Sequence, residues 1–334
     1  MKLPDFELEL PDSLEAAAAA LAEAPGAGLV AGGTDQLCNW KFRIRVPERV
    51  VSLARVPELR RREGRILGAG LRLAELERDP EVRERWPALA EALGRVATPL
   101  VRESATLGGN LCLDTRCFHL QQTREWREAA GSCLKAEGPA CRVLPKPGDR
   151  CVATYSGDLA PVLLVLGARL HLARAAAGGG LLRRVVELAD FHGGDGIQRF
   201  RDLQPGEILE AVEIAEDAEA WTAAYEKLAL RRAFDFPEGG VAAAVKWEHG
   251  RVRDLRLATT AYDTVPRLHP RPVLQHRGSR LEDERIEAIA RDLEAEVQPL
   301  RNTFLPPAYR KRMARVLARR ALRRLRPAAG AGPV

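Results

Sequence analysis

Five of the six cysteines of this chain fall within forty residues, from Cys112 to Cys151. Four of them follow the spacing Cys117-x15-Cys133-x7-Cys141-x9-Cys151. Thiolates bind soft metal ions and carry redox chemistry, whereas structural disulfides are rare in intracellular chains. Because the first residues lack the pattern of a secretory signal, the cluster indicates metal binding or redox work rather than disulfides.

The spacing of these thiols favours one kind of metal site over another. Zinc ribbons and fingers pair their ligands as C-x2-C or C-x4-C, and this spacing does not. Ligands so far apart must be brought together by the fold of a loop, which suits a 4Fe-4S cluster on four thiolates. The predicted metal ligands are therefore Cys117, Cys133, Cys141 and Cys151. Zinc is the alternative metal, and a set of idle thiols is the alternative without a metal.

The remaining thiols and a nearby histidine are not assigned to the cluster. Cys112 follows Asn110 by only two residues, where the chain is expected to face a bound diphosphate. His119 is an alternate ligand, although a lone histidine more often serves a surface or hydrogen-bonding role. Cys38 stands apart and is expected to be a small buried residue.

Two loops with paired glycines form the second chemical feature. They are Ala31-Gly-Gly-Thr-Asp35 and Thr106-Leu-Gly-Gly-Asn110. Paired glycines let backbone N–H groups approach a phosphate closely, and the adjacent threonine adds a hydroxyl donor. Neither loop is a GxGxxG or Walker motif, which argues against nicotinamide and ATP sites. A double glycine alone is more often a plain turn, but the two loops together suggest one diphosphate held from two sides.

Composition limits the class of protein. The chain has 334 residues, of which 46% are hydrophobic, enough for two or three domains with buried cores. No stretch is apolar enough for a membrane span, so a cytoplasmic protein is expected. The net charge of +6 is local: residues 301–334 carry ten Arg or Lys and no Asp or Glu. Met313, Leu317 and Ala321 recur every four residues there, which predicts a helix covering a domain edge or a partner, rather than a nucleic-acid site.

Strand and helix patterns alternate in a way that predicts an α+β fold. Helices are expected after a cap at Asp12 with Glu15 closing a capping box, near 72–78, 86–94, 281–296 and 308–325. Strands are expected at the N-terminus, at 29–31, within ERVVSL, at 65–70, and within EILEAVEI, VAAAVKWEHG and VRDLRLATTAY. A turn-rich stretch near 190–205 marks the predicted boundary between domains 1–192 and 193–328. Residues 329–334 are expected to form a disordered tail.

Four segments resemble landmarks of a known family. AGGTD at 31–35, ATLGGN at 105–110, SGDLAP at 156–161 and YEKLALRRAFDF at 225–236 are similar to those of the FAD-binding medium subunits of molybdenum hydroxylases, the xanthine and carbon monoxide dehydrogenase relatives. The resemblance implies a two-part FAD-binding domain of the PCMH/VAO-like type followed by a C-terminal α+β domain. Most such subunits pass directly from the GGN loop to the SDLAP-like segment. Here an insertion, 112–155, intervenes and resembles the 4Fe-4S insertion of 4-hydroxybenzoyl-CoA reductase beta subunits.

The resemblance also implies roles for single residues. Asp158 would hydrogen-bond the flavin or its ribityl chain, and Leu209 would pack on the flavin. Lys227 would stabilise reduced, anionic flavin, with a plain surface charge as the alternative. Asp35 has the alternative role of capping a turn. The implied FAD-binding residues are Leu29, Val30, Ala31, Gly32, Gly33, Thr34, Asp35, Gln36, Thr106, Leu107, Gly108, Gly109, Asn110, Asp158, Leu209 and Lys227.

The implied function is electron transfer, with no catalytic residue for substrate chemistry on this chain. Reduced ferredoxin would deliver electrons through the 4Fe-4S cluster and FAD to a small 2Fe-2S subunit and a large molybdenum-cofactor subunit. That assembly would remove the phenolic hydroxyl of 4-hydroxybenzoyl-CoA in aromatic degradation. Two alternatives stay open: the FAD subunit of an oxidising molybdenum hydroxylase, and a zinc-stabilised basic binding protein. Neither nucleic acid nor a membrane is an expected partner.

Overall fold

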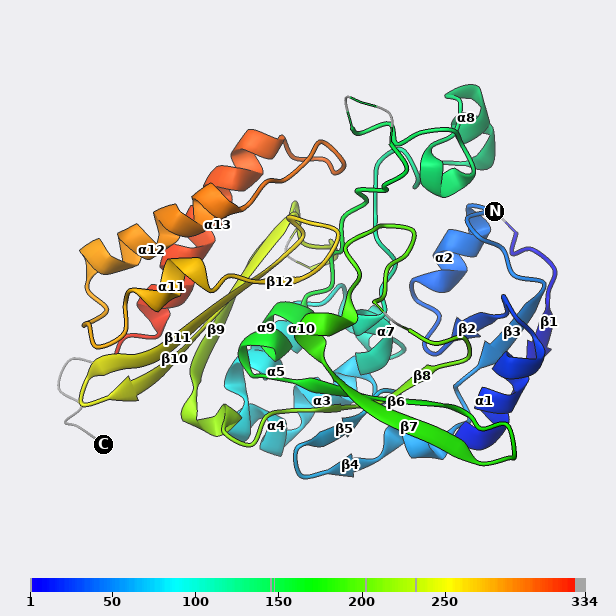
Figure 1. Cartoon of the computed structure of the whole chain (residues 1–334), viewed down its shortest axis with the longest axis horizontal. Helices are drawn as coiled ribbons and strands as arrows, with labels where there is room; N and C mark the ends of the chain where they lie inside the picture. The colour runs from blue at the N-terminus through cyan, green and yellow to red at the C-terminus, as the bar shows by residue number, and fades with distance from the viewer. Residues whose placement is uncertain (1, 145, 147, 202, 232, 328–334) are drawn as a thin grey trace.

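Three β-sheets organise the chain in a computed structural model that describes residues 2–144, 146, 148–201, 203–231 and 233–327. Their strand orders are β1-β3-β2, β4-β5-β8-β6-β7 and β12-β11-β10-β9. Figure 1 shows the first two sheets side by side and the third beyond them, flanked by long helices. This mixture of sheets and packed helices confirms the predicted α+β class. The predicted tail, 329–334, lies outside the described residues.

The first sheet is small and parallel. It is formed by β1 (Glu7–Glu9), β3 (Arg49–Ser52) and β2 (Gly28–Val30), and it is accompanied by α1 (Leu14–Glu23) and α2 (Gln36–Lys41). Leu14, Ala17 and Val51 are fully buried between helix and sheet. Parallel pairing requires crossover connections, and α1 supplies the one between β1 and β2. The connection leaves the loop after β2 at the sheet's carboxyl end.

Ser13, not Asp12, caps α1. The Ser13 hydroxyl accepts a hydrogen bond from the Ala16 N–H at 3.2 Å, while Glu15 accepts from the Gly180 N–H at 2.7 Å instead of closing a capping box. The predicted cap was therefore off by one residue. Helix start signals identify a turn, but adjacent Asp and Ser compete for the same N–H groups.

The corrected cap gives a test with a built-in control. Ser13→Ala should lower the free energy of unfolding by about 1 kcal/mol, because the Ala16 N–H in the first turn of α1 loses its acceptor. Asp12→Ala should leave it unchanged within about 0.5 kcal/mol, as expected for an exposed residue without a cap role. Urea unfolding followed by circular dichroism measures both. Equal losses for the two variants would restore Asp12 as the cap.

The second sheet is antiparallel and carries most of the helices. Its strands are β4 (Arg62–Glu63), β5 (Ile66–Gly68), β8 (Ile208–Glu213), β6 (Arg169–Ala175) and β7 (Leu181–Glu187). The surrounding helices are η1 (Pro57–Arg60), α3 (Leu73–Arg78), α4 (Pro80–Arg85), α5 (Pro87–Gly94), α6 (Pro99–Arg102), α7 (Leu107–Leu111), α9 (Leu159–Val165) and α10 (Leu188–Phe191). Their apolar side chains form one large core.

The predicted domain boundary at residue 192 differs from the structure. β8 pairs with both β5 and β6 and so completes the second sheet. The turn-rich stretch that suggested a boundary is instead a long loop that returns to this sheet. Turn formers mark where the chain changes direction, and they do not tell whether it then leaves the domain.

The two ends of the insertion are joined by a β-bridge. Arg116 and Thr154 exchange two backbone hydrogen bonds of 2.7 Å. Between them lie α8 (Arg124–Ala129) and η2 (Leu134–Ala136). In Figure 1 the insertion projects away from the sheets, with α8 at its outer end.

The C-terminal sheet is antiparallel and sandwiched. After η3 (Ala218–Ala220) it comprises β9 (Thr222–Leu228), β10 (Gly239–Glu248), β11 (Arg251–Thr260) and β12 (Arg267–Leu268). Helix α9 packs against one face through β10 and β11. The other face is covered by α11 (Arg271–Leu274), α12 (Asp283–Glu296) and α13 (Pro307–Arg324).

The basic C-terminal segment is the predicted helix, and it covers its own domain. Leu317 and Ala321 are buried on its inner face, while Met313 is only half-buried. Its arginines meet acids on neighbouring elements: Arg315 contacts Glu287, and Arg324 contacts Glu91 at 2.7 Å. Much of the positive charge is therefore compensated within the fold.

Among the described residues, no helix combines the length and the apolar character that crossing a membrane requires.

Candidate functional site

A cavity of about 980 Å³ lies between the first and second sheets. This volume is at the upper end of the range for cofactor sites. Both glycine loops line it, as does Leu209 on β8. The predicted FAD-binding residues that the structure brings to this cavity are Leu29, Val30, Ala31, Gly32, Gly33, Thr34, Asp35, Gln36, Thr106, Gly108, Gly109, Asn110 and Leu209.

The two loops converge because their glycines have no side chains. A Cβ atom on Gly32 would meet the Ser104 carbonyl oxygen at 1.9 Å, and one on Gly108 would meet the Ala69 Cβ at 2.7 Å. Thr106 caps α7, its hydroxyl accepting from the Gly109 N–H at 3.1 Å. The loop after β2 thus touches the segment that precedes α7, and residues of both loops line the same cavity. In the second loop the N–H groups of Gly108 and Gly109 already donate to the Ala69 carbonyl and the Thr106 hydroxyl.

Three predicted FAD-binding residues do not line the cavity. Leu107 is fully buried in the core around the second sheet. Asp158 and Lys227 form an ion pair with 3.0 Å between Oδ2 and Nζ, and their side chains are 3% and 7% exposed. Tyr225 donates to Asp158 at 2.8 Å, and Lys227 donates to the Arg95 carbonyl at 2.8 Å. The alternative of a plain surface charge for Lys227 is wrong, since that side chain is buried.

Burial governs the electrostatics of this pair. It raises the pKa of Asp158, and the neighbouring Lys227 and Tyr225 offset part of that rise by stabilising the carboxylate. Arg95, whose carbonyl accepts from Lys227, directly precedes the cavity-lining residues Val96 and Ala97. The pair therefore supports the cavity wall from behind.

Asp35 joins the first glycine loop to the insertion. Its carboxylate pairs with Arg116 and accepts a hydrogen bond from the Asp114 N–H at 3.3 Å. The Arg116 guanidinium stacks over the Phe236 ring, 3.8 Å from its centroid. No side-chain cap of α2 is formed by Asp35, so the alternative capping role is not what the structure shows.

Sequence reasoning missed much of the apolar lining. Phe191 ends α10, and Phe200, Leu203 and Pro205 come from the loop between α10 and β8. This stretch was interpreted as a domain boundary because it is rich in turn formers. The aromatic residues in this stretch were the sequence signal that could have identified it as part of the cavity lining.

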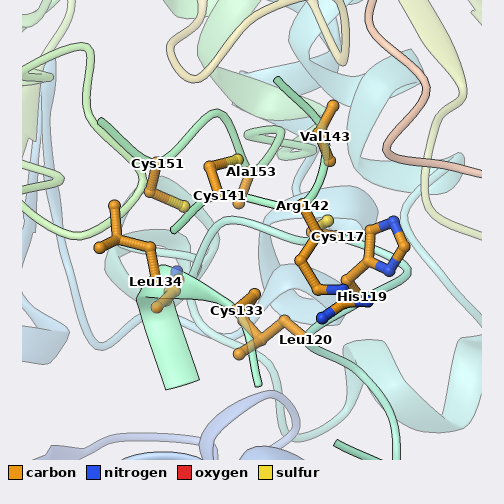
Figure 2. Close-up of a pocket in the computed structure, with 11 residues that line it drawn as sticks. Cys117, His119, Leu120, Cys133, Leu134, Cys141, Arg142, Val143, Cys151 and Ala153 are labelled. Carbon is orange, nitrogen blue, oxygen red and sulfur yellow. The ribbon is translucent and has the colours of Figure 1, made fainter. Parts of the chain in front are cut away.

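The four predicted cluster cysteines line one small cavity in the insertion. Figure 2 shows Cys117, Cys133, Cys141 and Cys151 around it, with His119 and Arg142 beside Cys117. Ile44, Leu120 and Ala153 pack against the thiols. The residues arrive from separate loop segments, as their spacing predicted. All six cysteines are free thiols.

The electrostatics of the thiols reflect their proximity. Burial, together with the adjacent Cys133, Cys151 and Cys141, raises the pKa of Cys117 to about 12, although the His119 N–H donates to its sulfur. Burial likewise raises the pKa of Cys151, which accepts from the Ala153 N–H. Backbone N–H donors to cysteine sulfur are a recurrent means of tuning iron–sulfur sites. Four clustered thiols, of which Cys117 and Cys151 have such donors, offer the ligand chemistry that an iron–sulfur group requires.

Within the part of the chain that the structure describes, no three His, Cys, Asp or Glu side chains converge closely enough to ligate one metal. In a cubane each thiolate binds a different iron, so the sulfurs surround the group instead of meeting at one point.

The other two cysteines lie elsewhere. Cys112 lines the large cavity, and burial raises its pKa to about 11. Cys38 is exposed on α2, so the expectation that it is buried is wrong. Its Sγ donates a hydrogen bond to the Thr34 carbonyl at 3.5 Å. Thr34 lies four residues earlier in the chain, so an exposed thiol can make this contact.

Family profiles divide the chain much as the sheets do. The profile of the FAD binding domain in molybdopterin dehydrogenase matches residues 4–216. The chain belongs to this family. The profile of the CO dehydrogenase flavoprotein C-terminal domain matches residues 223–325 of the same FAD-binding subunit. The first match ends beyond β8, in agreement with the sheet topology, and the second begins within β9.

Relatives of known activity share this organisation. The chain is 27% identical to the aldehyde oxidoreductase FAD-binding subunit of Escherichia coli over 251 residues, 72% of this chain and 77% of the relative. It is 39% identical to the carbon monoxide dehydrogenase medium chain of Hydrogenophaga pseudoflava over 113 residues, 32% of this chain and 39% of that one. The solved carbon monoxide dehydrogenase of the same organism superposes with a TM-score of 0.76 at 25% identity, covering 97% and 98% of the two chains. These matches confirm the predicted fold and an oxidoreductase flavoprotein subunit.

Proposed function

We propose that this FAD-binding subunit also carries a 4Fe-4S cluster on Cys117, Cys133, Cys141 and Cys151, and that it is the electron-entry subunit of a molybdenum-containing reductase. The supporting observation is that four thiols, three of them buried and that of Cys141 half-buried, line one cavity of a dedicated insertion. Bound FAD would supply exchange between one-electron and two-electron carriers. This chain's residues would hold FAD in the large cavity and the cluster in the insertion.

The assembly that we propose contains a large molybdenum-cofactor subunit and a small 2Fe-2S subunit, with reduced ferredoxin as donor. The substrate is 4-hydroxybenzoyl-CoA, which loses its phenolic hydroxyl on the large subunit. A low-potential cluster on the FAD subunit gives such a donor a place to deliver electrons ahead of the flavin. The resemblance of the insertion to reductase beta subunits supports this direction of flow.

A metal and flavin assay on the purified chain tests the proposal. We expect about four irons, equal acid-labile sulfide and one FAD per chain, with a brown colour. Zinc in place of iron, or no metal, would refute the cluster. Membership of the FAD-binding family already argues against the zinc-stabilised binding protein in which the glycine loops are plain turns.

A second candidate keeps the fold and reverses the flow: the FAD subunit of an oxidising molybdenum hydroxylase. It is favoured by the relatives, which are named as aldehyde oxidoreductase and carbon monoxide dehydrogenase subunits. The purified complex distinguishes the two. Aryl-CoA reduction that depends on ferredoxin supports the reductase, whereas turnover of an aldehyde or heterocycle with an electron acceptor supports the hydroxylase.

Gly196 provides a separate test of the cluster site. A Cβ on this residue would lie 2.6 Å from the Cys151 Sγ and 3.1 Å from the Ala153 Cβ. Neighbouring Asp195 accepts from the Cys151 N–H at 3.2 Å, and the Gly196 N–H donates to the Cys151 carbonyl at 2.8 Å. The loop that holds Gly196 therefore fixes one ligand from outside the insertion.

Replacing Gly196 by alanine should displace that sulfur. We expect Gly196→Ala to lose at least half of the bound iron while retaining FAD, because the large cavity is not touched. Gly148→Ala, at a glycine of the insertion with open space around it, is the control. Iron and flavin contents of the two purified variants are compared. Full iron occupancy in Gly196→Ala would mean that Cys151 is not a ligand.

A further inference from the structure

Lys135 is a fully buried cation between the two cavities. Its side chain is 0% exposed, and it lines the cysteine cavity from η2. Its Nζ donates to Asp114 Oδ1 at 2.6 Å, to Thr115 Oγ1 at 2.7 Å and to the Thr115 carbonyl at 3.2 Å. All three ammonium hydrogens therefore have an acceptor in a site without water contact.

Asp114 belongs to the other cavity. It lines the proposed FAD site together with Arg199, whose Nε lies 3.4 Å from its carboxylate. Its N–H donates to Asp35 in the first glycine loop. Lys135 lines the cysteine cavity and Asp114 lines the large cavity, so their ion pair connects the two.

A purely structural role does not explain why charged side chains, Lys135 and Asp114, occupy this buried position. A buried ion pair seldom stabilises a fold more than well-packed apolar side chains of similar volume would. A buried ammonium does, however, impose a strong local field, because little water screens it. Lys135 lines the same small cavity as the four cysteines, so its charge acts where their side chains meet.

We propose that Lys135, held by Asp114, is a positioning residue that sets the reduction potential of the iron–sulfur group on the cysteines. Reduction adds one electron and no proton, so the group becomes one unit more negative. The fixed positive charge of Lys135 stabilises that form and raises the potential, while Asp114 limits the rise. This inference rests on the proposed cluster and deepens it by naming the residues that tune electron passage toward the FAD cavity.

Two substitutions with opposite expected signs test the assignment in the full-length holo protein. Lys135→Met keeps the stem volume and removes the charge, so the midpoint potential of the cluster should fall. Asp114→Asn removes the counter-charge and should raise it. Lys135→Arg should restore most of the wild-type value, and Lys311→Met on α13 should leave it unchanged. Potentials are read from redox titrations followed by electron paramagnetic resonance.

The outcomes separate this inference from the cluster proposal. Because the pair is buried, the shifts should persist at high salt. Wild-type potentials in both Lys135→Met and Asp114→Asn, or shifts of the same sign, would overturn the assignment. If Lys135→Met fails to retain iron, the Asp114→Asn shift decides. A wild-type chain without iron refutes the proposed function itself, whereas an iron-loaded chain indifferent to both substitutions refutes only the role of Lys135.

Discussion

Gly32→Ala should reduce FAD affinity at least about 100-fold, since overpacking that separates two loops costs about 3 kcal/mol. The added Cβ would meet the Ser104 carbonyl oxygen at 1.9 Å, a backbone atom that cannot rotate away. The loop after β2 and the segment before α7 must then move apart. The wall that the two loops form around the cavity would then be distorted.

The measurement needs both affinity and folding. FAD content of the purified chain and titration of the FAD-free protein give the first, and a thermal melt gives the second. Gly178→Ala is the matched control, because that glycine, in the turn between β6 and β7, has open space where a Cβ would stand. Wild-type FAD affinity in Gly32→Ala would show that the glycine loops do not hold the cofactor.

Sequence reasoning located these loops because their requirement is local. A backbone that must approach a phosphate or another backbone needs glycine wherever the fold places it. The same holds for the helices at 86–94 and 281–296, which the structure shows at Pro87–Gly94 and Asp283–Glu296. The hydrophobic periodicity and the stop signals that predict a helix lie within it or directly beside it, so they do not depend on tertiary contacts.

The supports of the cysteine site could not be found in this way. The four cysteines were identified by their own chemistry, but Gly196 and Asp195 reach Cys151 from a loop forty-four residues away in sequence. Nothing in the pattern FHGGDG distinguishes a loop that contacts a ligand from one that ends a domain. Lys135 was equally hidden, because a lysine in a polar insertion is ordinarily exposed.

The resemblance placed Asp158 and Lys227 at the flavin, and the structure shows them paired behind the cavity wall. Their separation of 69 residues along the chain is bridged by the packing of α9 against the C-terminal sheet. A motif identifies a charged residue in the sequence, but only the fold shows which residue it pairs with. A direct action of the pair on the flavin stays a prediction. The free energy of unfolding and the FAD affinity, measured on the same variants, test it.

Lys227→Met should lower the free energy of unfolding by about 3–5 kcal/mol at neutral pH, because it leaves the Asp158 carboxylate buried without its cation. Asp158→Asn combined with Lys227→Met should recover most of the loss, since no buried charge remains. The control is Lys246→Met, which breaks the more exposed pair with Asp217 and should cost about 1 kcal/mol or less. Guanidinium unfolding measures all three.

The loss in Lys227→Met should depend on pH with a defined sign. Burial already raises the pKa of Asp158, and removing Lys227 takes away the largest opposing influence, so the folded-state pKa rises further. A carboxyl with a raised folded pKa binds its proton more tightly in the native than in the unfolded state. The variant should therefore be most stable below the ordinary pKa of aspartate and lose stability as pH rises through the raised value. A deficit that grew on acidification would contradict this.

FAD affinity of the double variant separates the two roles of the pair. Support of the cavity wall predicts an affinity within about threefold of wild type once stability is restored, a difference of less than about 1 kcal/mol. Direct contact with the flavin predicts a much larger loss that stability does not repair. Because neither side chain lines the cavity while Val96 and Ala97, next to the Arg95 carbonyl that Lys227 binds, do line it, we expect the first result.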